Sequence, residues 1–192
     1  MRKLVSLMHL SLDGYVAGPN GEMQWIKISE EIFDLAGKLT SHADTALYGR
    51  VTYDMMEAYW PTAADQPNPS KHDLEHSAWY KKVDKIVVST TLSSGNDRKR
   101  TVISEHVECG IKHLKEQDGS NILLLGSPQL TRTLIEHDLI DEAWWLINPI
   151  ILGQGIKMFP DLTAPKNLTF ISSELRNPGV IVTHSQRIPS PN

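Results

Sequence analysis

The chain contains very little cysteine, since Cys109 is the only one among its 192 residues. A single thiol excludes an internal disulfide and a metal site built from several cysteines. Long hydrophobic runs are absent as well, because no apolar stretch approaches the roughly 20 residues that a membrane-spanning helix needs. We therefore expect no membrane partner.

An excess of basic charge is also missing. The 19 Lys and Arg residues are outnumbered by 23 Asp and Glu residues, which gives a formal net charge of −4. Because binding to nucleic acid requires a basic face that neutralises phosphates, we do not expect nucleic acid as a partner. The first seven residues, MRKLVSL, lead directly into a strand-like pattern instead of the apolar core of a signal peptide. We therefore expect a cytoplasmic protein.

Segments that would divide the chain are scarce too. No linker rich in Pro, Ser or Gly and no internal repeat interrupts it, and 192 residues suffice for one substantial core. We therefore expect one domain spanning residues 1–192.

Strand-like and helix-like patterns alternate along most of the chain. Strands are indicated over 3–12, 85–89, 100–104 and 122–125, and helices over 29–40, 50–56, 73–82 and 128–135. Three further strand-like segments then follow without a convincing helix between them, at 142–148, 168–175 and 180–187. This order predicts an α/β fold that ends in antiparallel strands.

The segment Gly126-Ser127-Pro128 is the most informative local motif. It lies between the apolar run 122–125 and a helix-like segment, with Ser at the N-cap position and Pro at the first helical position. Such a turn presents backbone N–H groups and the positive end of a helix dipole, and Gly126 has no side chain to obstruct a phosphate. The motif is a candidate pyrophosphate site, although a Gly here also serves simply to allow the turn.

A second turn of the same design occurs earlier in the chain. Gly49 ends the apolar stretch 46–48, and Arg50-Val51-Thr52 opens a helix-like segment. Arg50 adds a planar cation with several donors, which suits a phosphate. Two Gly-marked helix starts, one of them basic, predict a site for a dinucleotide.

Other candidate groups are weaker. His72 and His76 are four residues apart, but their segment is polar and supplies no third ligand, so we expect surface histidines and no metal site. Cys109 lies in an amphipathic stretch, where a packed or half-exposed thiol is expected in preference to a nucleophile. His9 interrupts an otherwise apolar strand, and both a hydrogen-bonded core imidazole and a role in a pocket stay open.

Several longer stretches carry a family resemblance, among them SLMHLSLDGYVAG, LYGRVTYDMM, KIVVSTTL and LIDEAWWLINPIILGQG. In this order they resemble the dihydrofolate reductase-like superfamily, in particular the branch that contains the reductase domain of riboflavin biosynthesis. The resemblance covers almost the whole chain. It implies a three-layer α/β/α fold with a mixed, mostly parallel central sheet, an antiparallel C-terminal end, and NADPH as cofactor.

The resemblance also implies roles for single residues. In such proteins the Gly-Arg-x-Thr turn and the later Gly-containing turn bind NADPH, which points to Gly49, Arg50, Thr52, Gly126 and Ser127. Residues of the first strand and the following loop lie beside the nicotinamide, here His9, Val16 and Ala17. A Ser-Thr stretch lies beside the adenosine phosphate, here Ser89, Thr90 and Thr91.

The chain departs from the family at two places. The substrate carboxylate of dihydrofolate reductases corresponds to Phe33, and the adjacent acid, Asp34, is rotated from it by about 100° around the helix. Asp34 is a candidate proton donor if the helix register shifts by one residue, and ordered water is the alternative. Riboflavin reductases commonly have a Lys that meets substrate phosphate where this chain has Tyr15, and no deaminase signature of H-x-E with P-C-x-x-C occurs.

We therefore expect an NAD(P)H-dependent reductase that transfers a hydride to a small nitrogen heterocycle, of the 5-amino-6-(5-phosphoribosylamino)uracil type or the pterin type. The alternative is a nucleotide-binding or sensing module of the same fold without turnover. Trp144 and Trp145 point to opposite faces of one strand, which indicates burial on both sides. One of them is expected to be covered by a second subunit, so we expect a homodimer.

Overall fold

The computed structural model of the chain describes residues 1–93, 99–160, 162 and 164–187. The strands of its main sheet are β1 (Leu4–Ser11), β3 (Ala43–Gly49), β4 (Asp84–Val88), β5 (Arg100–Ile103), β6 (Asn121–Leu125), β7 (Glu142–Asn148), β9 (Leu168–Arg176) and β10 (Val180–Arg187). They lie in the order β5-β4-β3-β6-β1-β7-β10-β9. Neighbours from β5 to β7 are parallel, whereas β10 is antiparallel to both β7 and β9. The predicted mixed sheet with an antiparallel C-terminal end is confirmed.

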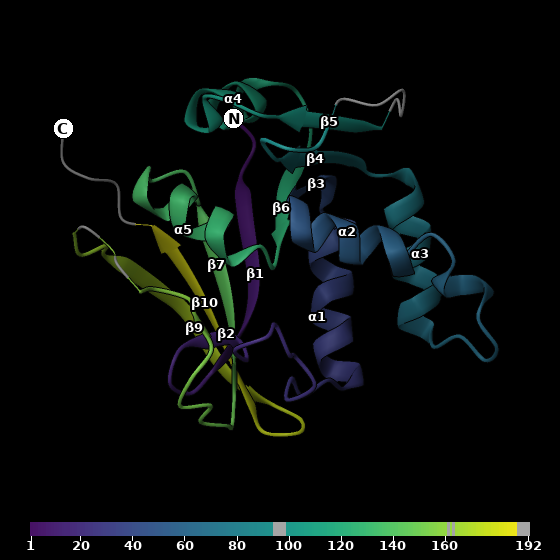
Figure 1. Ribbon diagram of the computed structural model, residues 1–192. Coiled ribbons are helices and arrows are strands. Elements are labelled where there is room, and N and C mark those ends of the chain that lie inside the picture. The colour runs from purple at the N-terminus through teal and green to yellow at the C-terminus, as the bar shows by residue number, and fades with distance from the viewer. Residues whose placement is uncertain (94–98, 161, 163, 188–192) are drawn as a thin grey trace.

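Helices cover both faces of this sheet (Figure 1). They are α1 (Glu30–Ser41), α2 (Arg50–Tyr59), α3 (Lys71–Lys82), α4 (Val107–Glu116) and α5 (Pro128–Glu136), with a short 3₁₀ turn at Ala63–Asp65. On one face α4 and α5 bury Ile111 and Leu134 against Leu4 of β1. On the other face α1 and α3 bury Ile32 and Tyr80. The result is the predicted three-layer α/β/α arrangement.

Capping side chains set the starts of α1 and α3. Ser29 Oγ accepts a hydrogen bond from Ile32 N at 3.4 Å, so α1 begins where the sequence predicts. Helix α3 begins two residues before the predicted start. There, Ser70 Oγ accepts from Asp73 N at 3.1 Å, while the Asp73 carboxylate accepts from Ser70 N at 2.9 Å.

The prediction that His72 and His76 are surface residues is wrong for His76, and His72 is half-buried. His76 is only 5% exposed and its ring centroid lies 4.0 Å from that of Trp60, at the end of α2. His72 stacks on Phe33 of α1, also at 4.0 Å. Burial lowers the pKa of His76 to about 3, so its imidazole is neutral. The polar composition around these histidines gave no indication that their rings contact aromatic side chains of other helices.

Two very short strands, β2 (Tyr15–Ala17) and β8 (Ile156–Lys157), form a separate two-stranded antiparallel sheet that was not predicted. In the part of the chain that the structure describes, no helix has the length and apolar character to cross a membrane. The same residues bring together no group of three or more His, Cys, Asp or Glu side chains that could hold a metal ion.

The parallel strands place their carboxyl ends at one edge of the sheet. Strand β3 pairs with β4 through Gly49 and Val88, and with β6 through Leu47 and Leu124. The turns that follow β3, β4 and β6 therefore lie side by side. In open α/β sheets this edge is the usual place for a ligand.

Candidate functional site

A groove of about 580 Å³ opens at the carboxyl edge of β3, β4 and β6. Its volume lies in the range of about 300 to 1,000 Å³ that is typical of small-molecule sites. Most of the residues predicted to contact a cofactor line it, namely Gly49, Arg50, Thr52, Ser89, Thr90, Thr91 and Ser127. Segments that are distant in the sequence therefore form one site.

Ser127 joins the two Gly-marked turns. Its Oγ accepts a hydrogen bond from Gly49 N at 2.9 Å, and its own N–H donates to Thr52 Oγ1 at 3.2 Å. Ser127 stands at the N-cap position of α5, but its φ of 55° is left-handed and its side chain does not cap that helix. The expectation of an N-cap serine is thus corrected: the hydroxyl holds the neighbouring turn in place.

Gly126, which precedes Ser127, is not part of the groove lining. Its φ is 58°, a conformation that favours glycine, and a Cβ at this position would lie 3.4 Å from Thr52 Cγ2. Its N–H donates to Leu7 O at 3.1 Å. The N–H groups of both Gly126 and Ser127 are therefore engaged within the protein and are not free for a phosphate.

The first turns of α2 and α5 supply other backbone donors. The first N–H groups of a helix have no acceptor within it, and in α2 that of Gly49 is taken by Ser127. This leaves the N–H groups of Arg50, Val51 and Thr52, three residues that line the groove. In α5 Pro128 has no N–H, so Gln129 and Leu130 provide the corresponding donors. Both helix N-termini open into the groove, which suits an anionic ligand.

The charge of the groove is positive. Arg50 and Arg132 line it, and its described lining contains no Asp or Glu. Arg50 Nη1 pairs with Asp54 Oδ2 at 3.2 Å, with both side chains 50% exposed. Arg132 was missed in the sequence because its position, in the second turn of α5, becomes relevant only once α5 is placed beside α2.

The Ser-Thr stretch after β4 forms one wall of the groove. Ser89 is buried, and its Oγ accepts hydrogen bonds from the N–H groups of Thr91 at 3.2 Å and Leu92 at 2.9 Å. The hydroxyl of Ser89 therefore shapes the turn. The side chains available to a ligand are those of Thr90 and Thr91, which are exposed.

The residues predicted to lie beside the nicotinamide are not in the groove lining. Val16 and Ala17 are buried in β2, and Ala17 pairs with Ile156, which does line the groove. His9 Nδ1 accepts a hydrogen bond from Asn148 Nδ2 at 3.3 Å. Burial lowers the pKa of His9 to about 4, so the ring is neutral near pH 7 and is not a source of an imidazolium proton.

The structure does not bring Asp34 to this groove. Its carboxylate pairs with Lys71 Nζ of α3 at 3.2 Å, and the two side chains are 65% and 72% exposed. Asp34 lines a separate cavity of about 250 Å³ between α1 and α3, together with Phe33 and His72. The structure therefore gives no support to the hypothesis that Asp34 faces the substrate pocket as a proton donor.

Tyr15 is buried in β2 at the position where the resemblance expects Lys. Its OH donates a hydrogen bond to Gly153 O at 3.2 Å, and Lys157 Nζ lies 5.8 Å from the centre of its ring. A cation is therefore still present on the neighbouring strand.

Comparison with known proteins agrees with this architecture. The family described as the RibD C-terminal domain matches residues 2–182. YyaP of Bacillus subtilis (strain 168), described as uncharacterized, is 30% identical over 184 residues, which cover 94% of this chain and 92% of YyaP. YwjB of the same organism, also described as uncharacterized, is 28% identical over 163 residues, covering 84% of this chain and 85% of YwjB.

Solved structures show the same fold at lower identity. A protein of Shewanella sp. PV-4, provisionally named for riboflavin biosynthesis, has a TM-score of 0.75 and 22% identity, covering 97% of this chain and 99% of that one. A pyrimidine reductase-like protein of Corynebacterium diphtheriae has a TM-score of 0.69 and 13% identity, covering 98% and 93%.

The Thermotoga maritima diaminohydroxyphosphoribosylaminopyrimidine deaminase/5-amino-6-(5-phosphoribosylamino)uracil reductase has a TM-score of 0.68 and 17% identity, covering 97% of this chain and 57% of that one. The match thus spans a little over half of that protein. Because the family model covers residues 2–182, the chain belongs to the RibD C-terminal domain family.

Proposed function

We propose that the protein is an NADPH-dependent reductase that transfers a hydride to a small nitrogen heterocycle, of the 5-amino-6-(5-phosphoribosylamino)uracil type or the pterin type. The observation that carries the proposal is the groove at the carboxyl edge of the sheet, where two helix N-termini and two arginines meet and the described lining holds no acid. Membership of a reductase-like family supports it.

The donor set of the groove fits a phosphate-bearing dinucleotide. Arg50 and the exposed hydroxyls of Thr90 and Thr91 would hold the adenosine phosphate, and the free N–H groups at the start of α2 and α5 would hold the pyrophosphate. Bound NADPH supplies the hydride, and the protein binds, orients and shields the reactants.

The proton has no obvious protein donor among the described residues of the site. His9 is neutral, and Asp34 is paired with Lys71 of α3 away from the groove. We therefore propose that ordered water delivers the proton to the heterocycle.

The substrate itself is tested by a screen. Tyr15 lacks the charge of the expected Lys, while Lys157 on the adjacent strand offers one. Phosphoribosylated aminouracils and unphosphorylated pterins should therefore be tested side by side, following NADPH oxidation by absorbance after NADPH binding has been titrated. Absence of NADPH binding would refute the proposal, and tight binding with no turnover on either class would favour the sensing module.

We also propose that the protein is a homodimer. The outermost strand β9 exposes Phe170 by 66% and Leu175 by 74%, and Leu175 pairs with Ile181 of β10, which is 43% exposed. A long edge strand with large apolar side chains usually gains a covering partner. Light scattering of the wild type and of Leu175→Lys tests this, since a dimer through β9 should dissociate in the variant and a monomeric wild type would refute it.

A further inference from the structure

Arg132 connects the groove, where the proposed cofactor phosphates bind, to strand β8. Its side chain lines the groove, and its Nη1 donates a hydrogen bond to the backbone O of Lys157 in β8 at 2.8 Å. Within the described part of the chain, no acceptor contacts its Nη2 or Nε. A planar guanidinium therefore holds β8 with one nitrogen and keeps its other donors for a ligand.

The β2–β8 ladder is short, and both residues of β8 are exposed, while Val16 of β2 and Met158 directly after β8 are buried in the core. Its cross-strand partners are Tyr15 with Lys157 and Ala17 with Ile156, and Ile156 also lines the groove. A two-stranded ladder is at best marginally stable by itself. The charge-assisted hydrogen bond from Arg132 therefore links the exposed strand β8 to α5, in addition to the anchor that the buried Met158 provides.

We infer that Arg132 is a positioning residue that couples phosphate binding in the groove to the order of the β2–β8 pair. This rests on the proposed function, because the phosphate belongs to the proposed cofactor. A phosphate oxygen that accepts from the free donors of Arg132 fixes the guanidinium, and the fixed guanidinium holds the Lys157 carbonyl. Through β8 the contact reaches Val16 and Ala17. Because coupling between two equilibria is reciprocal, an ordered β2–β8 pair in turn strengthens phosphate binding.

Amide hydrogen exchange measures this coupling. The reporter is the N–H of Met158, which donates to Gly14 O at 2.8 Å next to the Lys157 carbonyl. Exchange is followed in the wild type, in Arg132→Met and in the control Lys166→Met, each free, with NADPH and with inorganic pyrophosphate.

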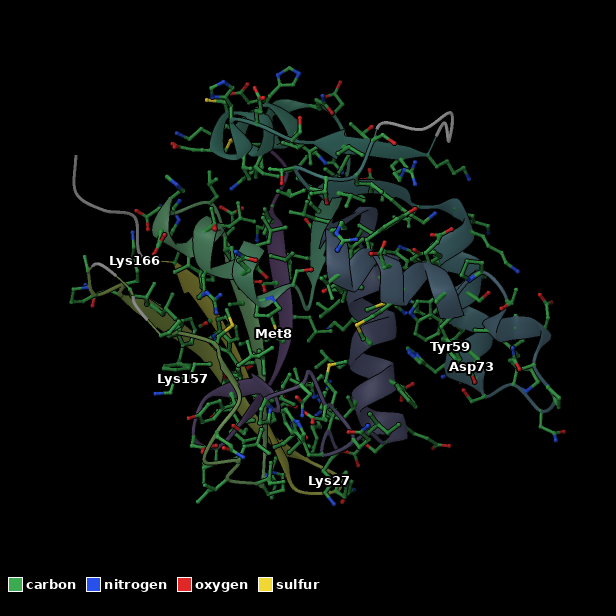
Figure 2. All side chains as sticks on the ribbon, in the orientation of Figure 1. Met8, Lys27, Tyr59, Asp73, Lys157 and Lys166 are labelled. Atoms are coloured by element: carbon green, nitrogen blue, oxygen red, sulfur yellow. The ribbon has the colours of Figure 1, made fainter. Side chains whose placement is uncertain are left out.

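Lys166 is a matched control because its Nζ also donates to a backbone carbonyl, that of Glu136 at 2.8 Å, and it does not line the groove. Figure 2 shows that Lys166 lies apart from Lys157.

In the free protein, Arg132→Met should exchange the Met158 amide about tenfold faster than the wild type, the factor expected from one charge-assisted hydrogen bond. Ligand should slow the exchange of the Met158 amide in the wild type and in Lys166→Met. In Arg132→Met the exchange rates with and without ligand should agree within about twofold, and this variant should bind NADPH about tenfold more weakly than the wild type. Unchanged exchange of the β6 amides shows that the variant is folded, and a purely structural role would not remove the response to ligand.

Equal Met158 exchange in free wild type and Arg132→Met would overturn the contact between Arg132 and β8. An equal ligand-induced slowing in both would overturn the coupling. A response to pyrophosphate without NADPH binding would support the inference and refute the proposed cofactor. No response to either ligand in the wild type would overturn both.

Discussion

Replacement of Arg50 by alanine tests how the groove distinguishes NADPH from NADH. The two cofactors differ by the adenosine 2′-phosphate, and Arg50 is the cation at the start of α2 that lines the groove near Thr90 and Thr91. We expect Arg50→Ala to weaken NADPH binding and to leave NADH binding almost unchanged, because only NADPH carries the group that Arg50 would meet.

The exposure of Arg50 sets the size of the effect. Hydrogen bonds to charged groups contribute about 1.5 to 3 kcal/mol. The Arg50 side chain is 50% exposed and already pairs with Asp54 at 3.2 Å, so solvent and the carboxylate both reduce its gain from a phosphate. The lower limit applies, and about 1.5 kcal/mol corresponds to about tenfold in Kd.

Asp54 provides the matched control. Asp54→Asn frees Arg50 from its ion pair and removes a negative charge from the first turns of α2, so NADPH affinity should rise about twofold, within the range of exposed ion pairs. Fluorescence titration with both cofactors at low and high salt measures these values, and the preference for NADPH should shrink at high salt. An equal loss of both cofactors in Arg50→Ala would show that the residue does not contact the 2′-phosphate.

Three further predictions concern Ser127, Asp34 and His76. Ser127→Ala leaves Gly49 N without its acceptor and should lower the free energy of unfolding by about 1 to 3 kcal/mol, whereas the exposed control Ser41→Ala should change it by less than about 0.5; equal chemical-denaturation midpoints would contradict the link. Asp34→Asn should leave kcat and NADPH affinity within about twofold, and a loss of about 100-fold in kcat would restore Asp34 as a proton donor. Burial lowers the pKa of His76 from 6.5 to about 3, so the unfolded chain binds the proton first and stability falls as pH drops from 6.5 toward 3. His76→Phe should make that fall shallower in denaturation curves measured across this window, and parallel pH profiles would show that His76 is not responsible.

Much of the fold follows from local patterns. The strands 142–148 and 180–187 have the predicted limits, and the helix that begins after Ser29 starts at its predicted cap. These segments are long enough for a period to be read from them. Strands β2 and β8 contain too few residues for any period, so the sequence could not reveal them.

The sequence predicted which turns form the groove, but not which of their backbone amides are free to bind a ligand. The Gly49 and Gly126 turns mark helix starts after strands, and a parallel sheet brings such turns together. Which amides are free depends on distant partners, such as Leu7 O for Gly126 and Thr52 Oγ1 for Ser127. The burial of His76 likewise depends on Trp60, which belongs to another helix.

The outward direction of Asp34 has a different cause. Lys71 of α3 supplies a partner on the exposed side of α1, while Phe33 turns toward His72. Helix α3 is tied to the end of α2, where Tyr59 OH donates to Asp73 of α3 at 2.9 Å, and Figure 2 shows these two side chains next to each other. Helix α3 thus decides the surroundings of Phe33 and Asp34 on α1.

The hydrogen bond between Gly49 N and Ser127 Oγ also bears on how the protein folds. It joins residues that are 78 positions apart, and it forms only when β3 and β6 lie next to each other at the centre of the sheet. Contacts of such separation form late, since a long loop must close before they contribute. A chain in which only neighbouring helices and strands have assembled would lack the groove. The appearance of ligand binding during refolding would therefore report when the central sheet is complete.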